Sequence, residues 1–195
     1  MEPGLPSVPI AVFLVGFMGA GKSSVGRALA QQLNWLFEDL DDRIVKLEGR
    51  SVPEIFRASG EAAFRQAEHA ALRQVLEDLH SGIARVIALG GGAFAQPGNA
   101  ALLKDADVPT VFLDASVSEL WRRCCAQASE TGAERPLLQD QDQFRRLYQV
   151  RRKSYAAASF KIDTGFRSLE TIAAEIARKL GLKKIKVRTE EGDSE

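Results

Sequence analysis

The stretch "IAVFLVGFMGAGKSS" (residues 10–24) decides the fold of this chain. Six apolar residues, enough for a buried strand, run into the pattern G-x-x-x-x-G-K-[ST], and the amphipathic stretch "SSVGRALAQQL" follows. Glycines let consecutive backbone N–H groups turn toward one anion, and the amino end of a helix adds partial positive charge. This context favours a phosphate-binding loop over a chance glycine-rich turn. Lys22 would reach the outer phosphates of a nucleotide, and the Ser23 hydroxyl would hold Mg²⁺.

The same apolar run could instead be the core of a signal peptide. No basic segment precedes it, however, Glu2 does, and Gly-Lys-Ser follows at once. The run is also too short to span a bilayer. We therefore interpret it as a buried strand and expect no membrane partner.

Composition excludes several classes of protein. A chain of 195 residues with 45% hydrophobic residues fits one globular domain. Lys plus Arg equals Asp plus Glu at 26 each, so no overall field attracts nucleic acid or an anionic membrane. The only cysteines, Cys124 and Cys125, are adjacent and would form a strained disulfide, which favours a reducing cytoplasm.

Four further apolar runs of strand length, at residues 35–40, 85–90, 110–115 and 159–163, alternate with helical stretches. Such alternation predicts an α/β fold of three layers, in which a central parallel five-stranded sheet carries helices on both faces. The last helical stretch, "SLETIAAEIARKL", places its apolar residues on one face and is followed by Gly181, a helix stop.

Two segments interrupt the alternation. Residues 42–80 read as a helical insertion broken at Gly49 and Gly60, suited to a small substrate-binding subdomain. Residues 124–138 lack apolar periodicity and read as a mobile lid between helices. We expect a single kinase domain over residues 1–181. The charged tail, 182–195, has little to bury, so we expect disorder there.

The acidic stretch "FEDLDDRI" (residues 37–44) reads as the end of a strand. Strand alternation would place Asp39 and Asp41 on one face, about 6.6 Å apart, one near a metal and one near an acceptor hydroxyl. The alternative is that Asp41 or Asp42 caps the following helix, and for Asp42 we prefer this reading. For Glu38 we expect a solvated or edge position.

Acceptor-site candidates lie farther along the chain. In "GEAAFRQAE" the spacing places Glu61, Arg65 and Glu68 on one helix face, which alone is an ordinary surface charge cluster. Three consecutive glycines in "LGGGA" follow a buried strand and would let a ligand approach the backbone. Arginines in "ERPLL" and "VRRKSY" would be solvated individually, but next to a phosphate loop they become anion clamps.

Taken in order, these motifs resemble those of shikimate kinase. The resemblance covers about residues 10–180 and rests on "LVGFMGAGKSSVGRALA", "FEDLDDRI", "GRSVPEIF", "GEAAFRQAE", "ALGGGA", "RPLL" and "RKSY" with the preceding Arg151. It implies a nucleoside-monophosphate-kinase-like fold, ATP and Mg²⁺ on the donor side, and the 3-hydroxyl of shikimate as acceptor. Catalysis would fall to Lys22, Asp41 and Arg135.

The resemblance also implies a role for each matching residue. ATP phosphates would bind the loop formed by Gly19, Ala20, Gly21, Lys22, Ser23 and Ser24. Ser23 would bind Mg²⁺ directly and Asp39 through water. Shikimate would contact Asp41 through its hydroxyls, Arg65 and Arg151 through its carboxylate, and the backbone of Gly90, Gly91 and Gly92. Arg135 would close over the donor phosphates as the lid arginine, and Arg123 and Arg167 would lie near the adenine.

Two rival functions remain at the level of sequence. Another small-metabolite P-loop kinase, such as a gluconate kinase, would share the phosphate loop but should lack the aspartate pair, "FR" and "GGG" together. A regulatory nucleotide-binding module without catalysis would be expected to have lost Lys22, Ser23 or the aspartates, which are all intact. We expect a monomer whose partner is a small molecule.

Overall fold

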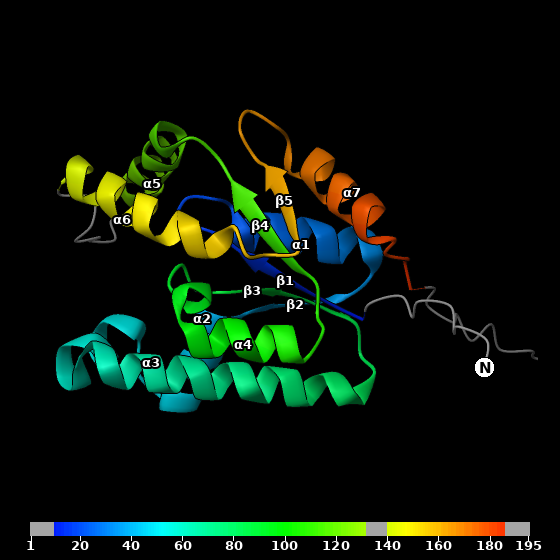
Figure 1. The fold of residues 1–195 in the computed structure, drawn as a ribbon, viewed down its shortest axis with the longest axis horizontal. Coiled ribbons are helices and arrows are strands. Elements are labelled where there is room, and N and C mark those ends of the chain that lie inside the picture. The colour runs from blue at the N-terminus through cyan, green and yellow to red at the C-terminus, as the bar shows by residue number, and fades with distance from the viewer. Residues whose placement is uncertain (1–9, 132–139, 186–195) are drawn as a thin grey trace, which may run out of the picture.

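A computed structural model describes residues 10–131 and 140–185 (Figure 1). Its sheet has five strands in the order β2-β3-β1-β4-β5, and every pairing is parallel. The strands are β1 (Ala11–Val15), β2 (Leu36–Asp39), β3 (Arg85–Ala88), β4 (Thr110–Asp114) and β5 (Phe160–Asp163). The predicted parallel five-stranded sheet is confirmed.

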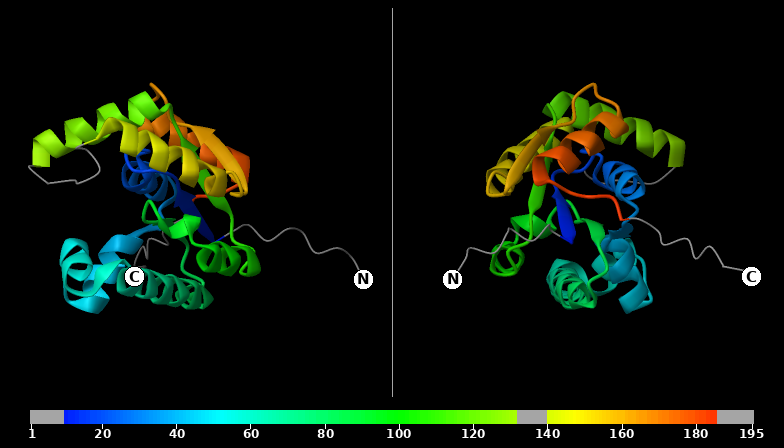
Figure 2. Two further views of the ribbon diagram at one scale, coloured as in Figure 1. Left: turned by 60° about the vertical axis from the view of Figure 1, so that its left-hand side comes forward. Right: turned by 90° about the vertical axis from the view of Figure 1, so that its right-hand side faces the viewer.

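Helices lie on both faces of this sheet, as predicted. They are α1 (Lys22–Leu33), α2 (Leu40–Glu48), α3 (Val52–Asp78), α4 (Pro97–Asp105), α5 (Val117–Thr131), α6 (Gln141–Tyr155) and α7 (Leu169–Leu180), with short 3₁₀ turns η1 (Leu79–Ser81) and η2 (Ala93–Ala95). Helices α1 and α7 pack side by side on one face, and α3 and α4 pack together on the other (Figure 2). Among the helices described, none has the length and apolarity needed to cross a bilayer.

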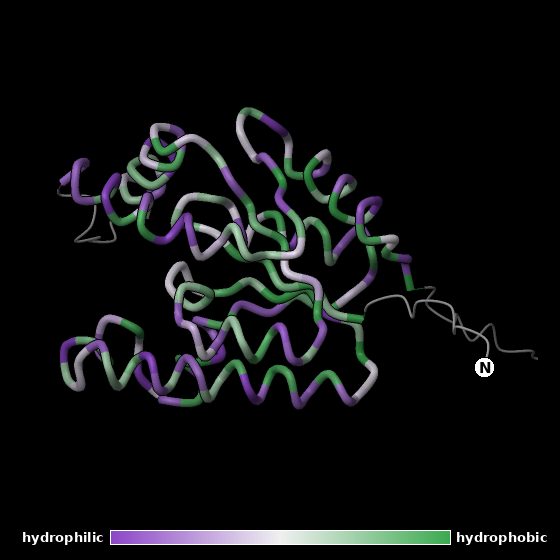
Figure 3. Tube along the Cα trace, in the orientation of Figure 1, coloured by the Kyte–Doolittle hydropathy of each residue, from purple (hydrophilic) through white to green (hydrophobic). Residues whose placement is uncertain are grey.

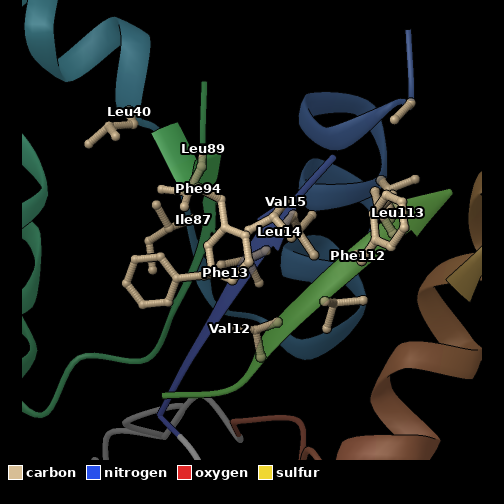
Figure 4. Close-up of a cluster of buried hydrophobic side chains, with 14 of the residues drawn as sticks. Val12, Phe13, Leu14, Val15, Leu40, Ile87, Leu89, Phe94, Phe112 and Leu113 are labelled. Atoms are coloured by element: carbon tan, nitrogen blue, oxygen red, sulfur yellow. The ribbon is translucent and has the colours of Figure 1, made fainter. Parts of the chain in front are cut away.

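The core is built around the central strands. Every residue of β1 and of β4 is buried, which is why β1 is wholly apolar and β4 has the apolar centre "VFL" between Thr110 and Asp114. The hydropathy colouring shows the same apolar centre, and Figure 4 shows Phe13, Leu14 and Leu113 packed between the layers. Figure 3 also shows polar and apolar residues alternating along the outer helices, which bury one face only.

The acidic stretch corrects one local prediction. Strand β2 ends at Asp39, which caps α2: its carboxylate accepts a hydrogen bond from the backbone N–H of Asp41 at 3.1 Å. Asp41 therefore lies in the first turn of a helix, and the prediction that Asp39 and Asp41 share a strand face is wrong. So is the prediction that Asp42 is the cap. An aspartate at the N-cap position ends the strand at Asp39, one residue before the end of the apolar run at 35–40.

Glu38 lies on the edge strand β2, as predicted, but it is not solvated. Its carboxylate pairs with Arg43, and Arg85 donates to it at 3.3 Å. Only 18% of the Glu38 side chain is exposed. The Glu38 carboxylate therefore links the edge strand β2 to helix α2 through Arg43 and to strand β3 through Arg85.

The predicted helical insertion breaks where expected. Helix α2 ends at Gly49, which has a φ of +64°, and α3 is interrupted at Gly60, where φ is +77° and ψ is 178°. A left-handed φ is accessible to glycine at no steric cost, so these two residues divide the insertion into short helical pieces. The first piece of α3, from Val52, can thereby turn toward the carboxyl ends of the strands.

The lid prediction is partly wrong. Residues 124–131 belong to helix α5, because Leu120 and Cys124 are buried on one face of it and secure it to the core. Residues 132–139, with Arg135, lie outside the described residues. The described part of the tail is held in place: the backbone N–H of Ile185 donates to Leu33 O at 2.9 Å, and Trp35 Nε1 donates to Lys183 O at 3.2 Å.

Gly26 gives a test of how tightly α1 packs on the sheet. A Cβ at this position would collide with Cε2 of Phe37 on β2 and lie 3.3 Å from Leu14. We predict that Gly26→Ala lowers the free energy of unfolding by about 1–3 kcal/mol, the usual cost of overpacking a core. Denaturant unfolding measures this, with Gln31→Ala on the exposed face of the same helix as the control. Equal stability of both variants would contradict the close contact.

Candidate functional site

The loop between β1 and α1 forms an anion cradle. Gly21 precedes α1 in a left-handed conformation, φ +87°, and no side chain caps the helix, so the first N–H groups of α1 are left for a ligand. Lys22 folds back over the loop, and its ammonium donates to Gly16 O at 2.9 Å and Phe17 O at 3.1 Å. The loop thus presents a half-buried cation and unpaired donors toward one point.

Two glycines let this loop lie against the neighbouring chain segment. A Cβ at Gly16 would lie 2.6 Å from Leu113 O, and one at Gly19 would lie 2.6 Å from Leu120 O and 2.8 Å from Cys124 Sγ. Both glycines also have a positive φ, so a side chain would be strained as well as crowded. The phosphate loop therefore packs directly against β4 at Gly16 and against α5 at Gly19.

Ser23 and Asp39 meet at the mouth of the cradle. The Ser23 hydroxyl donates to Asp39 Oδ2 at 2.7 Å, although the two residues are carried by different elements. A hydroxyl and a carboxylate are the oxygen ligands that Mg²⁺ prefers. Within the described ranges, no group of three or more His, Cys, Asp or Glu side chains is placed to hold a metal. A Mg²⁺ ion here would therefore complete its shell with phosphate and water oxygens.

The predicted acceptor residues converge on one cavity of about 510 Å³ next to the cradle. Lys22, Ser23, Asp39, Asp41, Arg65, Gly90, Gly91, Gly92 and Arg151 all line it. Because the sheet is parallel, the carboxyl ends of β1, β2 and β3 bring these separate segments to one edge. A larger cavity of about 750 Å³ lies at the opposite ends of the strands and contains none of the predicted site residues.

In the glycine run at 90–92, Gly90 and Gly92 are needed for space. None of them has a positive φ. A Cβ at Gly90 would lie 2.7 Å from Asp41 Oδ1 and 3.2 Å from Glu68 Oε1, and a Cβ at Gly92 would lie 2.8 Å from the Arg65 guanidinium. The glycine run thus lets the charged side chains of the cavity pass directly over the backbone.

Two carboxylates point unsatisfied oxygens into this space. Asp41 Oδ1 and Glu68 Oε1 are buried and have no hydrogen-bond partner in the described structure. Burial raises the pKa of Asp41, and the nearby Asp39 carboxylate raises it further, although Lys22 opposes this. Burial likewise raises the pKa of Glu68, with Arg65 opposing. Buried acceptors without donors indicate that a ligand with hydroxyl groups would complete them.

Two arginines face these carboxylates. Arg65 donates to Glu68 at 3.0 Å and to Glu61 at 3.0 Å, which confirms the predicted shared helix face. Arg151 enters from α6, where it donates to Gly91 O at 3.3 Å and lies over the Phe17 ring. The site therefore combines hydrogen-bond acceptors with two cations that can hold a ligand carboxylate.

Several residues of the cavity were not predicted as site residues. Phe56 and Phe64, with ring centroids 4.6 Å apart, form an apolar wall, and Gln127 reaches the cavity from α5. Glu68 is only 1% exposed, and the buried Tyr155 donates its hydroxyl to Gly91 O. The spacing of Arg65 and Glu68 was visible in the sequence, but their burial was not.

The predicted adenine residues lie on the other side of the phosphate loop. Arg123 and Arg167 line a cavity of about 220 Å³ together with Ala20 and Gly21. Arg123 is held by Glu119 at 2.8 Å and donates to Thr164 O at 2.6 Å. Ser24 lies exposed on α1. Two cavities thus flank a single phosphate cradle, and this arrangement is typical of a P-loop phosphotransferase for a small acceptor.

Comparison with known proteins identifies the family. A family model described as shikimate kinase matches residues 18–181. Among curated relatives, the shikimate kinase of Geobacter metallireducens is 43% identical over 174 residues, covering 88% of this chain and 92% of that one. That of Aquifex aeolicus is 37% identical over 166 residues, covering 85% and 92%. The chain belongs to the shikimate kinase family, and this makes it a kinase.

Solved structures agree with the family and the fold. The shikimate kinase of Acinetobacter baumannii in complex with shikimate has a TM-score of 0.77 at 31% identity, covering 92% of this chain and 97% of that one. A gluconokinase from Sinorhizobium meliloti has a TM-score of 0.56 at 20% identity, covering 89% and 93%. The second likeness concerns the fold alone.

The raised pKa of Asp41 has a consequence for stability. The native state binds this proton more tightly than the unfolded state, so the free energy of unfolding falls as pH rises from the ordinary value of 3.8 through the raised one. We predict that, without nucleotide or metal, Asp41→Asn has a higher Tm than the wild type at pH 8, and that the difference vanishes below about pH 4. Thermal unfolding across pH measures it.

Asp42→Asn is the matched control, because Asp42 is an exposed neighbour on the same helix. This variant should gain no stability at pH 8. If Asp41→Asn is no more stable than Asp42→Asn, Asp41 is not a desolvated charge.

Proposed function

We propose that this chain transfers the γ-phosphoryl group of ATP to the 3-hydroxyl of shikimate, with Mg²⁺ bound at Ser23 and Asp39. The observation that carries the proposal is the single cavity in which Asp41, Glu68, Arg65 and Arg151 surround the glycine run beside the phosphate cradle. Shikimate presents hydroxyl groups and one carboxylate. The cavity offers buried oxygen acceptors for the former and two guanidinium groups for the latter.

The reaction requires alignment and neutralisation of charge. Phosphoryl transfer passes through a loose transition state, so a strong base is not obligatory. Lys22 would leave its loop carbonyls to contact the transferred phosphoryl group. Asp41 would orient the acceptor hydroxyl and could accept its proton. Bound Mg²⁺ would neutralise negative charge on the phosphate oxygens.

The proposal also covers the lid, the cellular compartment and the oligomeric state. Arg135 and residues 132–138 of the predicted lid lie outside the described residues, and we propose from the family resemblance that they close over the donor. Neither Cys124 nor Cys125 takes part in a disulfide among the described residues, which supports a reducing compartment such as the cytoplasm. A single chain supplies all the site residues described above, which supports a monomer.

The function is tested by incubating the protein with Mg²⁺, ATP and one acceptor from a panel that includes shikimate, gluconate and other sugar acids and cyclitols. We expect ADP release that depends on shikimate, with little above the ATP-only background for the rest. ADP release that gluconate stimulates as strongly would favour the rival kinase. Release independent of any acceptor, or no release, would reject the proposal.

Arg65 tests the carboxylate clamp. We predict that Arg65→Ala raises KM for shikimate about tenfold to a hundredfold, because one charge-assisted hydrogen bond to the ligand is lost. KM for ATP should change little. Arg73→Ala, an exposed arginine on the same helix, is the control. Steady-state kinetics with each substrate varied measure both constants, and an unchanged KM for shikimate in Arg65→Ala would remove Arg65 from the clamp.

A further inference from the structure

Asp114 is a buried carboxylate at the carboxyl end of β4 that does not line the acceptor cavity. Three donors converge on it. The Tyr148 hydroxyl lies 2.9 Å from Oδ1, while Arg152 Nη2 and Lys161 Nζ lie 3.0 Å and 2.9 Å from Oδ2. Burial opposes ionisation, but Lys161, Tyr148 and Arg152 outweigh it and lower the pKa of Asp114. The carboxylate is therefore charged at neutral pH.

Two of the three donors belong to α6, the helix that carries the acceptor clamp. Tyr148 and Arg152 are four residues apart and face Asp114, and Arg151 and Tyr155 are four residues apart and both donate to Gly91 O. The two pairs therefore lie on adjacent faces of the same helix. A rotation or shift of α6 about Asp114 would move Arg151 and Tyr155 away from Gly91.

The nucleotide side depends on a different atom of the same residue. The backbone carbonyl of Asp114 accepts from Thr164 N at 2.8 Å and from Thr164 Oγ1 at 3.1 Å. Thr164 in turn accepts a hydrogen bond from Arg123, which lines the small cavity beside the phosphate loop. Changes to the carboxylate leave this carbonyl in place, so they should affect the acceptor side selectively.

We propose that Asp114 is a positioning residue for the acceptor: its carboxylate fixes α6 so that Arg151 and Tyr155 hold the substrate carboxylate and the Gly91 carbonyl in register. Asp114 itself touches no substrate. This inference rests on the proposed function, since it concerns the geometry of the same acceptor cavity.

Lys161 provides a matched comparison for Arg152. Both cations contact the same oxygen at nearly the same distance, and both side chains are about half exposed, but only Arg152 lies on α6. We expect Arg152→Met to raise KM for shikimate about two- to fivefold, the range for one partly exposed ion pair, and Arg152→Lys to restore most of the loss. Lys161→Met should leave KM for shikimate unchanged. KM for ATP and kcat should stay near the wild-type values in all three.

Thermal unfolding separates positioning from general stability. Each Met variant loses one ion pair of similar exposure, so their Tm values should be similar while their KM values for shikimate differ. If both Met variants raise this KM equally, or if neither does, Asp114 has no positioning role. Asp114→Asn removes the charge from both pairs at once and should raise KM for shikimate more than Arg152→Met does; a smaller rise would count against the proposal.

A double variant tests whether the effect passes through the clamp. In the Arg151→Ala background, Arg152→Met should add little to KM for shikimate, because the group that it positions is absent. If Arg152→Met raises KM for shikimate by the same factor in the Arg151→Ala background as in the wild type, the effect does not pass through Arg151 and the proposal is wrong. The wild type separates this inference from the proposed function. If it releases no ADP in response to shikimate, the proposed function is wrong. If its activity is normal but Arg152→Met and Asp114→Asn leave KM for shikimate unchanged, only the role of Asp114 is wrong.

Discussion

The hydrogen bond between Ser23 and Asp39 joins the donor and acceptor halves of the molecule. Ser23 lies in the first turn of α1 after β1, Asp39 ends β2, and strand β3 lies between β1 and β2 in the sheet. The bond therefore spans a strand, and the glycine run that follows β3 lies next to it. Because Asp39 also caps α2, the same carboxylate sets the direction in which Asp41 leaves the sheet. One contact thus places the phosphate loop together with the residues that we propose as metal ligands and acceptor carboxylate.

The acceptor cavity concentrates charge that the fold must tolerate. Asp41 and Glu68 are desolvated, and each has an oxygen that no donor satisfies. Arg65 compensates Glu68 directly, and Lys22 compensates Asp41 at longer range. Such a site costs free energy in the empty protein and recovers it when ligand hydroxyls supply the missing hydrogen bonds. A polar cavity of this kind is a mark of function rather than of stability.

The sequence predicted the sheet and most of the site because those features have strong periodic or glycine-based signals. Residues 10–24 alone predicted a strand, a phosphate loop and a helix. Parallel topology then predicted that the motifs after the other strands lie beside this loop. The boundary at Asp39 failed because an aspartate suits both a strand end and a helix cap. Glu68 was predicted only as part of a surface charge cluster, because the i, i+3 spacing of Arg65 and Glu68 is the same on a solvent-exposed helix face as on a buried one. Helix α5 was underestimated because only Cys124 is buried among residues 124–130, so this part of the helix has no apolar period in the sequence.

The glycines at 90–92 also separate two kinds of mutational damage. None needs a left-handed backbone, and an added methyl at Gly90 or Gly92 would meet the far end of a movable side chain, Asp41 or Arg65. The fold can accept such a methyl by displacing that side chain, whereas the reaction loses the group displaced. Selection at Gly90 and Gly92 would then act almost purely through activity. Variants there should accumulate in the cell as folded, inert protein, unlike variants at Gly16 or Gly19, where backbone and packing are compromised together.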